Sequence, residues 1–99
     1  MLAHTEGVLA PPSPELAPFF DRAGALIQLP RRQHRKIAVL EWLVTQLPAG
    51  ARLTEVEMNA CLRSIHDDVA VLRRYLVDFG FVQRPEPGVY VTPERPDAP

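Results

Sequence analysis

The sequence predicts a small α+β domain that is mainly helical. Its 99 residues are 46% apolar and 23% charged, which is the composition of one ordinary globular domain. Apolar residues recur at helical spacing in three stretches, and two short extended runs around a Pro/Gly turn follow them. The domain is expected to span residues 14–92. Segments 1–13 and 93–99 are rich in proline without an apolar period, and we expect both to be disordered.

The first long helix is predicted from about Arg32 to Leu47. Its apolar positions follow helical spacing: Ile37, Leu40, Leu43, Val44 and Leu47. A Pro-Ala-Gly sequence at 48–50 ends the run, because proline and glycine disfavour a continuing helix. Trp42 lies at the edge of the apolar stripe. We expect it to be partly exposed, where it would pack against the N-terminal segment or a second subunit.

A short helical extension is predicted before that helix, at Glu15–Phe20. The following Leu26–Leu29 segment is extended in character, because Pro30 biases the residue before it away from helical geometry. We expect this segment to cross the domain surface. An apolar cluster in the extension comprises Leu16, Phe19 and Phe20. If the domain leaves this cluster uncovered, it predicts a twofold contact between two copies of the chain.

A capping box marks the start of the second helix. The Thr54 hydroxyl is placed to accept a hydrogen bond from the amide of Glu57, while the Glu57 carboxylate accepts one from the amide of Thr54. The helix is expected to end near Arg63. Asp67 and Asp68 follow almost at once, and their carboxylates suit the start of a third helix. The sequence therefore predicts two helices joined by a tight turn.

The third helix is predicted over residues 67–79 with one apolar face. Its core face comprises Val69, Val71, Leu72, Tyr75, Leu76 and Phe79. Its exposed face comprises Ala70, Arg73, Arg74, Val77 and Asp78. Gly80 is expected to adopt the left-handed conformation that ends a helix.

Two strands are predicted after this helix, at Phe81–Arg84 and Val89–Thr92, joined by a turn over residues 85–88. A further short strand is predicted at Arg52-Leu53, where it would pair with this hairpin. The resulting order is helix, short strand, helix, helix and two-stranded wing. This order is typical of a winged helix-turn-helix domain with a short N-terminal helical extension.

A family resemblance covers about residues 20–92. It is carried by Leu29-Pro30, the basic run to Lys36, Val39–Leu43, Leu53–Asn59, Leu62, His66-Asp67-Asp68, Leu72–Asp78, Gly80 and Arg84. These residues resemble the bacterial domain-of-unknown-function 2087 family. The resemblance implies a winged-helix domain, which some members carry fused to helix-turn-helix regulators. The Arg73-Arg74-x-Leu76 sequence followed by Gly80 and Arg84 also resembles the recognition helix and wing of bacterial repressors.

The candidate nucleic-acid contacts are basic residues in three places. They are Arg31, Arg32, Arg35 and Lys36 at the start of the first long helix, Arg73 and Arg74 on the third helix, and Arg84 on the wing. In a complex with double-stranded DNA, the third helix would meet base edges or phosphates in the major groove, and the others would contact the backbone. Cations at a helix start oppose the macrodipole, which a phosphate would offset. A solvated, screened basic run is the alternative.

Two function classes fit this sequence. One is a small DNA-binding transcriptional regulator; the other is a protein-interaction domain on the same frame, with a regulatory protein or a second copy as partner. Asp67 and Asp68 repel phosphates at the start of the third helix, and Asp78 is placed to neutralise Arg74. The net charge of -1, from 11 basic and 12 acidic residues, gives no general attraction to DNA.

The sequence predicts no enzyme, no cofactor and no metal site. Cys61 lies on the apolar side of its helix, so a catalytic pair with His66 is disfavoured against a core thiol. No CxxC or HxxxH spacing occurs. A single cysteine, the lack of a secretory signal and the lack of a membrane-length apolar run predict a cytoplasmic protein that does not bind membranes.

Overall fold

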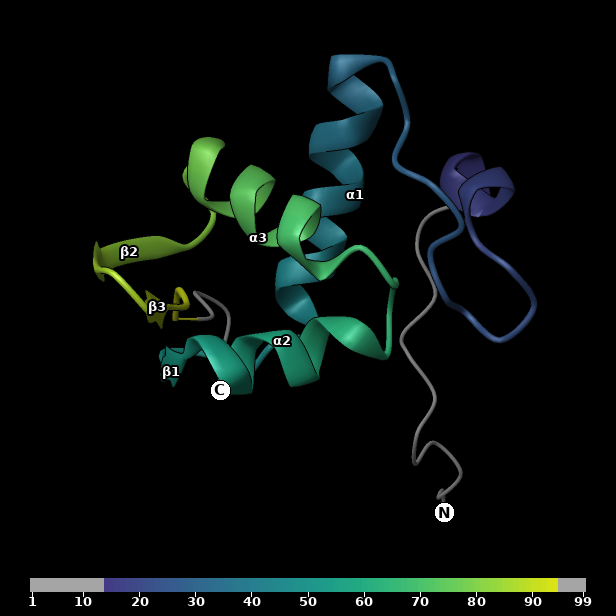
Figure 1. The fold of residues 1–99 in the computed structure, drawn as a ribbon. Helices are drawn as coiled ribbons and strands as arrows, with labels where there is room; N and C mark the ends of the chain where they lie inside the picture. The colour runs from purple at the N-terminus through teal and green to yellow at the C-terminus, as the bar shows by residue number, and fades with distance from the viewer. Residues whose placement is uncertain (1–13, 95–99) are drawn as a thin grey trace.

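The structure is a computed structural model that describes residues 14–94. Its elements are η2 (Pro14–Phe19), α1 (Gln33–Thr45), β1 (Arg52–Thr54), α2 (Glu55–Arg63), α3 (Val69–Asp78), β2 (Gln83–Glu86) and β3 (Val89–Val91) (Figure 1). The predicted class, α+β and mainly helical, is therefore confirmed. The predicted disorder of 1–13 and 95–99 falls outside the described residues. Pro93, which was predicted to begin the disordered tail, accepts a hydrogen bond from the amide of Gly50 at 2.8 Å.

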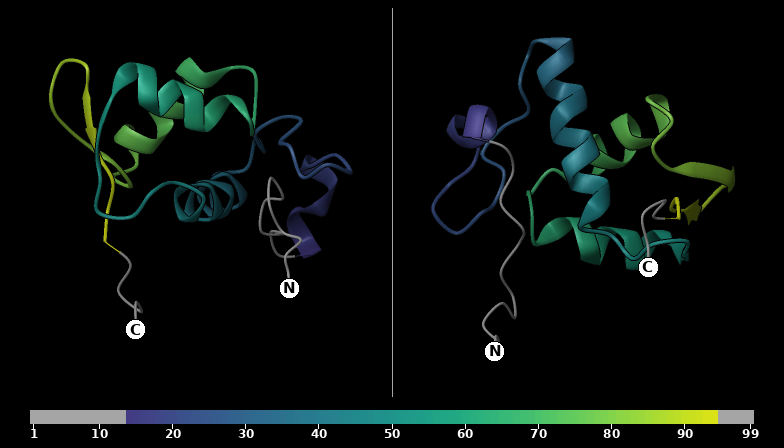
Figure 2. Two further views of the ribbon diagram at one scale, coloured as in Figure 1. Left: turned by 90° about the horizontal axis from the view of Figure 1, so that it is seen from below. Right: turned by 180° about the vertical axis from the view of Figure 1, so that it is seen from behind.

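The three α-helices enclose the core. Leu40, Leu43, Met58, Leu62, Leu72 and Leu76 are fully buried, so each helix contributes at least one wholly covered side chain. Seen nearly end-on, α1 has α2 and α3 together on one side of it (Figure 2, left). The three-stranded sheet lies at one end of the molecule and η2 at the other (Figures 1 and 2). Burial of these apolar side chains supplies the main driving force for folding.

The capping box at the start of α2 is confirmed. The Thr54 hydroxyl accepts from the Glu57 amide at 3.1 Å, and Glu57 Oε1 accepts from the Thr54 amide at 2.8 Å. The helix ends at Arg63, as the sequence predicts. Asp68 then caps α3, because its Oδ1 accepts from the amide of Val71 at 3.2 Å. Local side-chain caps therefore mark the starts of both α2 and α3.

Replacing Thr54 by alanine is expected to lower the free energy of unfolding by about 1 kcal/mol, because the hydroxyl that caps α2 is lost. Urea denaturation of the wild type and the variant measures this change. Glu57→Gln is the matched control: glutamine also accepts at this position of a capping box, so its stability should lie within a few tenths of a kcal/mol of the wild type. Equal stability of Thr54→Ala and the wild type would contradict the capping role.

The first strand of the hairpin begins later than the sequence predicts. The prediction of a strand from Phe81 is wrong, because the amides of Phe81 and Val82 both donate to the carbonyl of Leu76, at 2.9 and 3.1 Å, and so close the end of α3. Gly80 has φ +80°, as predicted for the residue that ends this helix. The strand instead runs over Gln83–Glu86 and includes Pro85. It is an edge strand, where a residue without an N–H is tolerated.

The sheet has the order β1-β3-β2 and is antiparallel throughout. The predicted pairing of the short strand with the hairpin is confirmed: Leu53 lies opposite Tyr90. Beyond β3, the buried Thr92 hydroxyl donates to the carbonyl of Pro48 and accepts from the amide of Ala51 at 2.8 Å. The segment between α1 and β1 is therefore held to the end of β3, and this contact fixes the position of the hairpin beside the helices.

The N-terminal extension packs closely on the domain. The Phe20 and Trp42 rings meet edge to face, with centroids 4.8 Å apart. The packing of Trp42 on the N-terminal segment is therefore confirmed, but its expected partial exposure is wrong, because only 9% of it is accessible. The expected surface path of Leu26–Leu29 is wrong for Leu26, which is buried and donates its amide to the carbonyl of Ile65 at 2.7 Å.

Candidate nucleic-acid interface

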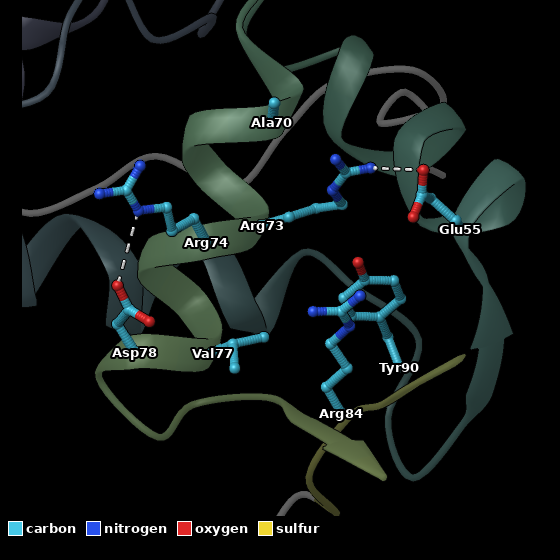
Figure 3. Close-up of a pocket in the computed structure, with 8 residues that line it drawn as sticks. All are labelled: Glu55, Ala70, Arg73, Arg74, Val77, Asp78, Arg84 and Tyr90. Atoms are coloured by element: carbon cyan, nitrogen blue, oxygen red, sulfur yellow. Dashed lines mark ion pairs between the residues drawn. The ribbon is translucent and has the colours of Figure 1, made fainter. Parts of the chain in front are cut away.

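A groove lies between α3, the start of α2 and the hairpin (Figure 3). Its volume is about 290 Å³. The residues that line it are Glu55, Ala70, Arg73, Arg74, Val77, Asp78, Arg84 and Tyr90. Three of the seven candidate nucleic-acid contacts predicted from the sequence, namely Arg73, Arg74 and Arg84, therefore meet in one place. They come from two elements, because α3 supplies the first two and β2 the third.

Arg73 is held against α2. Its Nη1 donates to Asn59 Oδ1 at 2.7 Å and lies 3.4 Å from Glu55 Oε2. Its guanidinium carbon is 6.0 Å from the centre of the Tyr90 ring, within range of a cation–π contact. The predicted exposure of this side chain is wrong, because only 18% of it is accessible. These contacts hold the Arg73 guanidinium close to α2 and to Tyr90.

Arg74 points outward from the same helix. Its side chain is 78% exposed, and its Nε lies 3.9 Å from Asp78 Oδ2 one turn further on (Figure 3). The predicted pairing of Arg74 with Asp78 is therefore confirmed. An exposed pair of this kind contributes roughly 0.3–0.5 kcal/mol and is screened by salt. A phosphate therefore needs to displace only a weak partner to bind Arg74.

Arg84 projects from β2 over the opposite side of the groove (Figure 3). Its guanidinium carbon lies 5.9 Å from the Tyr90 ring centre, so Tyr90 contacts two arginines. Among residues 14–94, no carboxylate forms an ion pair with Arg84. The neighbouring Glu86 pairs instead with Arg52 at 2.9 Å. Arg84 thus keeps its full charge available to an incoming anion.

The charges that line the groove sum to +1, from three arginines and two carboxylates. Because the whole chain carries -1, the groove is locally positive on a slightly acidic protein. Asp67 and Asp68 do not line it, and Asp68 caps α3. Of the two acidic residues predicted to repel phosphates at the start of α3, Asp68 therefore has a structural role as a helix cap.

The remaining candidate contacts lie elsewhere. Arg31, Arg32 and Arg35 line a second groove of about 240 Å³ together with Phe19, Gln28 and Pro30. Lys36 is engaged with α3, because its Nζ lies 4.6 Å from the centre of the Tyr75 ring. The seven predicted basic residues are therefore divided among three places. Three line the groove between α3 and the hairpin, three line the second groove, and Lys36 contacts Tyr75 between α1 and α3.

Sequence reasoning missed three residues that contact the groove arginines, and two of them, Glu55 and Tyr90, line the groove itself. Glu55 and Asn59 are four residues apart on α2 and hold Arg73 jointly, and Tyr90 comes from β3. The i,i+4 spacing of a carboxylate and an amide was visible in the sequence. Their partner lies 14 residues beyond Asn59 on another helix. No local pattern gives that pairing, which depends on how α2 packs against α3.

The described part of the chain offers few groups for metal binding or catalysis. Residues 14–94 contain no cluster of three or more His, Cys, Asp or Glu side chains that could hold a metal ion. Cys61 is partly buried against the core. His66 Nδ1 lies 2.8 Å from the carbonyl of Leu26, which is a donor position within the fold. Within the same residues, every helix is too short or too polar to cross a membrane.

The structure is a small α+β domain with a locally positive groove between α3 and the hairpin. Residues 25–92 match the model of the domain-of-unknown-function 2087 family, whose members are described as an uncharacterized protein conserved in bacteria. The match covers more than half of the chain, and the chain belongs to this family. Neither the curated proteins nor the solved structures gave a match. All eight residues that line the groove between α3 and the hairpin lie inside the matched segment.

Proposed function

We propose that this chain is a winged helix-turn-helix domain that binds double-stranded DNA and acts as a non-enzymatic transcriptional regulator. The order of elements supports this proposal. Helix α1 precedes the short strand β1, two helices joined by a tight turn follow, and a hairpin pairs back on β1. In this arrangement α3 is the recognition helix, and the β2–β3 hairpin is the wing.

The convergence of three arginines on one groove between α3 and the hairpin supports the proposal most strongly. With α3 in the major groove of the DNA, the exposed Arg74 reaches a phosphate at the edge of the major groove. Arg84 reaches the flanking DNA backbone. Weak pairing of Arg74 and the lack of a described carboxylate partner at Arg84 leave both charges available. Arg31, Arg32 and Arg35 supply a further backbone contact if the duplex extends to the start of α1.

Amide chemical-shift mapping tests this orientation. A ¹⁵N-labelled chain titrated with a duplex of about two helical turns should show its largest shifts over Ala70–Asp78 and Gln83–Glu86, because those backbones would face the DNA. The amides of Arg63 and Ser64, which lie in another groove with Asp21, serve as internal controls and should not move. Shifts confined to the start of α1, or no shifts at all, would contradict the proposed binding mode.

A protein-interaction domain is the second candidate. Two of the three groove arginines already have carboxylate partners within the chain, Glu55 and Asp78, and Val56 on α2 is 78% exposed. An exposed apolar residue beside paired charges suits a protein surface, with a regulatory protein or a second copy of this chain as partner. Under this function, the same titration with DNA gives no shifts on α3.

The exposed apolar surface available for a dimer contact is smaller than the sequence indicates. Leu16 is buried within the domain, and Phe20 packs on Trp42. The uncovered large apolar side chains among the described residues are Ile27, at 56%, and Val56. Sedimentation of the wild-type chain at high concentration measures the fraction that forms a dimer. A Val56→Asp variant that sediments as the wild type does would place any dimer contact away from α2.

A further inference from the structure

We propose that Arg73 recognises a guanine in the major groove, whereas Arg74 and Arg84 hold the phosphate backbone. This inference rests on the proposed DNA binding and divides its three arginines by role. The notable difference is burial. The Arg73 side chain is 18% exposed and the Arg74 side chain 78%, although they are neighbours on one helix.

The guanidinium of Arg73 is fixed before any ligand arrives. Asn59 and Glu55 both hold Nη1, and Tyr90 lies within 6.0 Å of the guanidinium carbon. Because α2 supplies both the hydrogen-bond partner Asn59 and the ion-pair partner Glu55, the side chain is positioned by a helix. A side chain held in this way loses little rotamer freedom on binding, and base recognition benefits from such fixed geometry.

The donors needed for guanine remain available. Both contacts of Arg73 use the same nitrogen, Nη1. In Figure 3, Nη1 points to Glu55, and the other two nitrogens lie on the opposite side of the guanidinium carbon. Nε and Nη2 carry parallel N–H bonds on that edge, and no described residue accepts from either. A two-donor edge of this kind matches the O6 and N7 acceptors of guanine.

Arg74 and Arg84 have the opposite character. Both are exposed and neither is held by a short hydrogen bond within the described residues, since Arg74 has one contact at 3.9 Å and Arg84 one ring contact. An exposed cation that is not held by a hydrogen bond suits phosphates, whose positions vary little with base sequence. Ala70 and Val77, on the same face of α3, add small apolar side chains that contact thymine methyl groups in a major groove. Of the three groove arginines, Arg73 is therefore the one whose fixed position best suits recognition of a specific base.

Selection of preferred duplexes from a randomised pool, using the full chain, tests this division. The selected sequence should contain an invariant guanine, and replacing it should weaken wild-type binding by about 5- to 100-fold. In Arg73→Ala this discrimination should fall below about 3-fold. Arg74→Ala is the matched control, because it removes the same charge from the next residue. It should lower affinity for all duplexes alike and keep the guanine preference.

A change in the DNA keeps the test valid if Arg73→Ala does not fold. Replacing the guanine by 7-deazaguanine, which lacks N7, should weaken wild-type binding several-fold at that one position. Asn59→Ala, which removes the holding contact, should reduce the same discrimination without changing affinity for random DNA. Duplex binding without guanine preference, or a preference that survives in Arg73→Ala, would overturn this inference and leave DNA binding intact. Absence of any duplex binding would overturn both.

Discussion

Replacing Arg74 and Arg84 together by alanine is expected to lower the affinity for duplex DNA about 100-fold at about 50 mM salt. Each phosphate contact contributes roughly 0.9 to the slope of log affinity on log salt, so loss of two contacts should flatten that slope by about 2. Both side chains line the groove, and both are largely exposed, so their removal should leave the fold unchanged. Fluorescence anisotropy of a labelled duplex, measured at several salt concentrations, gives both quantities.

The matched control is Arg22→Ala with Arg63→Ala, which removes the same net charge. Both residues are exposed and neither lines the groove between α3 and the hairpin. This control should change affinity by less than about 3-fold, because charges outside the interface act only through the screened field. Equal losses in the two double variants would mean that net charge, and not the groove, governs binding.

Replacing Leu76 by alanine is expected to lower the free energy of unfolding by about 2–5 kcal/mol, the usual effect of truncating a buried leucine. Leu76 is fully buried on α3, and its carbonyl accepts the two amides that lead into the hairpin. A loss of this size is a large fraction of the roughly 5–15 kcal/mol that stabilises a small domain. Urea denaturation followed by circular dichroism measures it.

The control for this change is Val56→Ala, on the exposed surface of α2. Its free energy of unfolding should stay within about 0.5 kcal/mol of the wild type, because no buried contact is lost. If Leu76→Ala proves as stable as this control, α3 does not pack in the core as described.

The turn and the helix starts could be predicted from sequence because they depend on neighbouring residues. The pairing of Thr54 with Glu57 and the cap by Asp68 each span three residues, so their hydrogen bonds follow from local spacing. Gly80 was found in the same way, because a left-handed helix end favours glycine. Helical periodicity likewise placed the leucines of α3 in the core.

The candidate site was only partly predictable, because tertiary packing decides it. The helical wheel placed Arg73 on the exposed face, but packing of α3 against α2 brings it to Glu55 and Asn59. The late start of β2 has the same origin: the carbonyl of Leu76 takes the amides that a strand would need. The covering of Trp42 depends on Phe20, which lies 22 residues earlier in the chain.

Salt-dependent titration of the wild-type chain with a labelled duplex tests DNA binding most directly. The groove and the start of α1 offer about three phosphate contacts, so log affinity should fall with log salt with a slope of roughly -3. Binding should be detectable at micromolar protein in about 50 mM salt, where backbone contacts are strongest. No change in anisotropy at tens of micromolar protein would contradict DNA binding and favour the protein-interaction function.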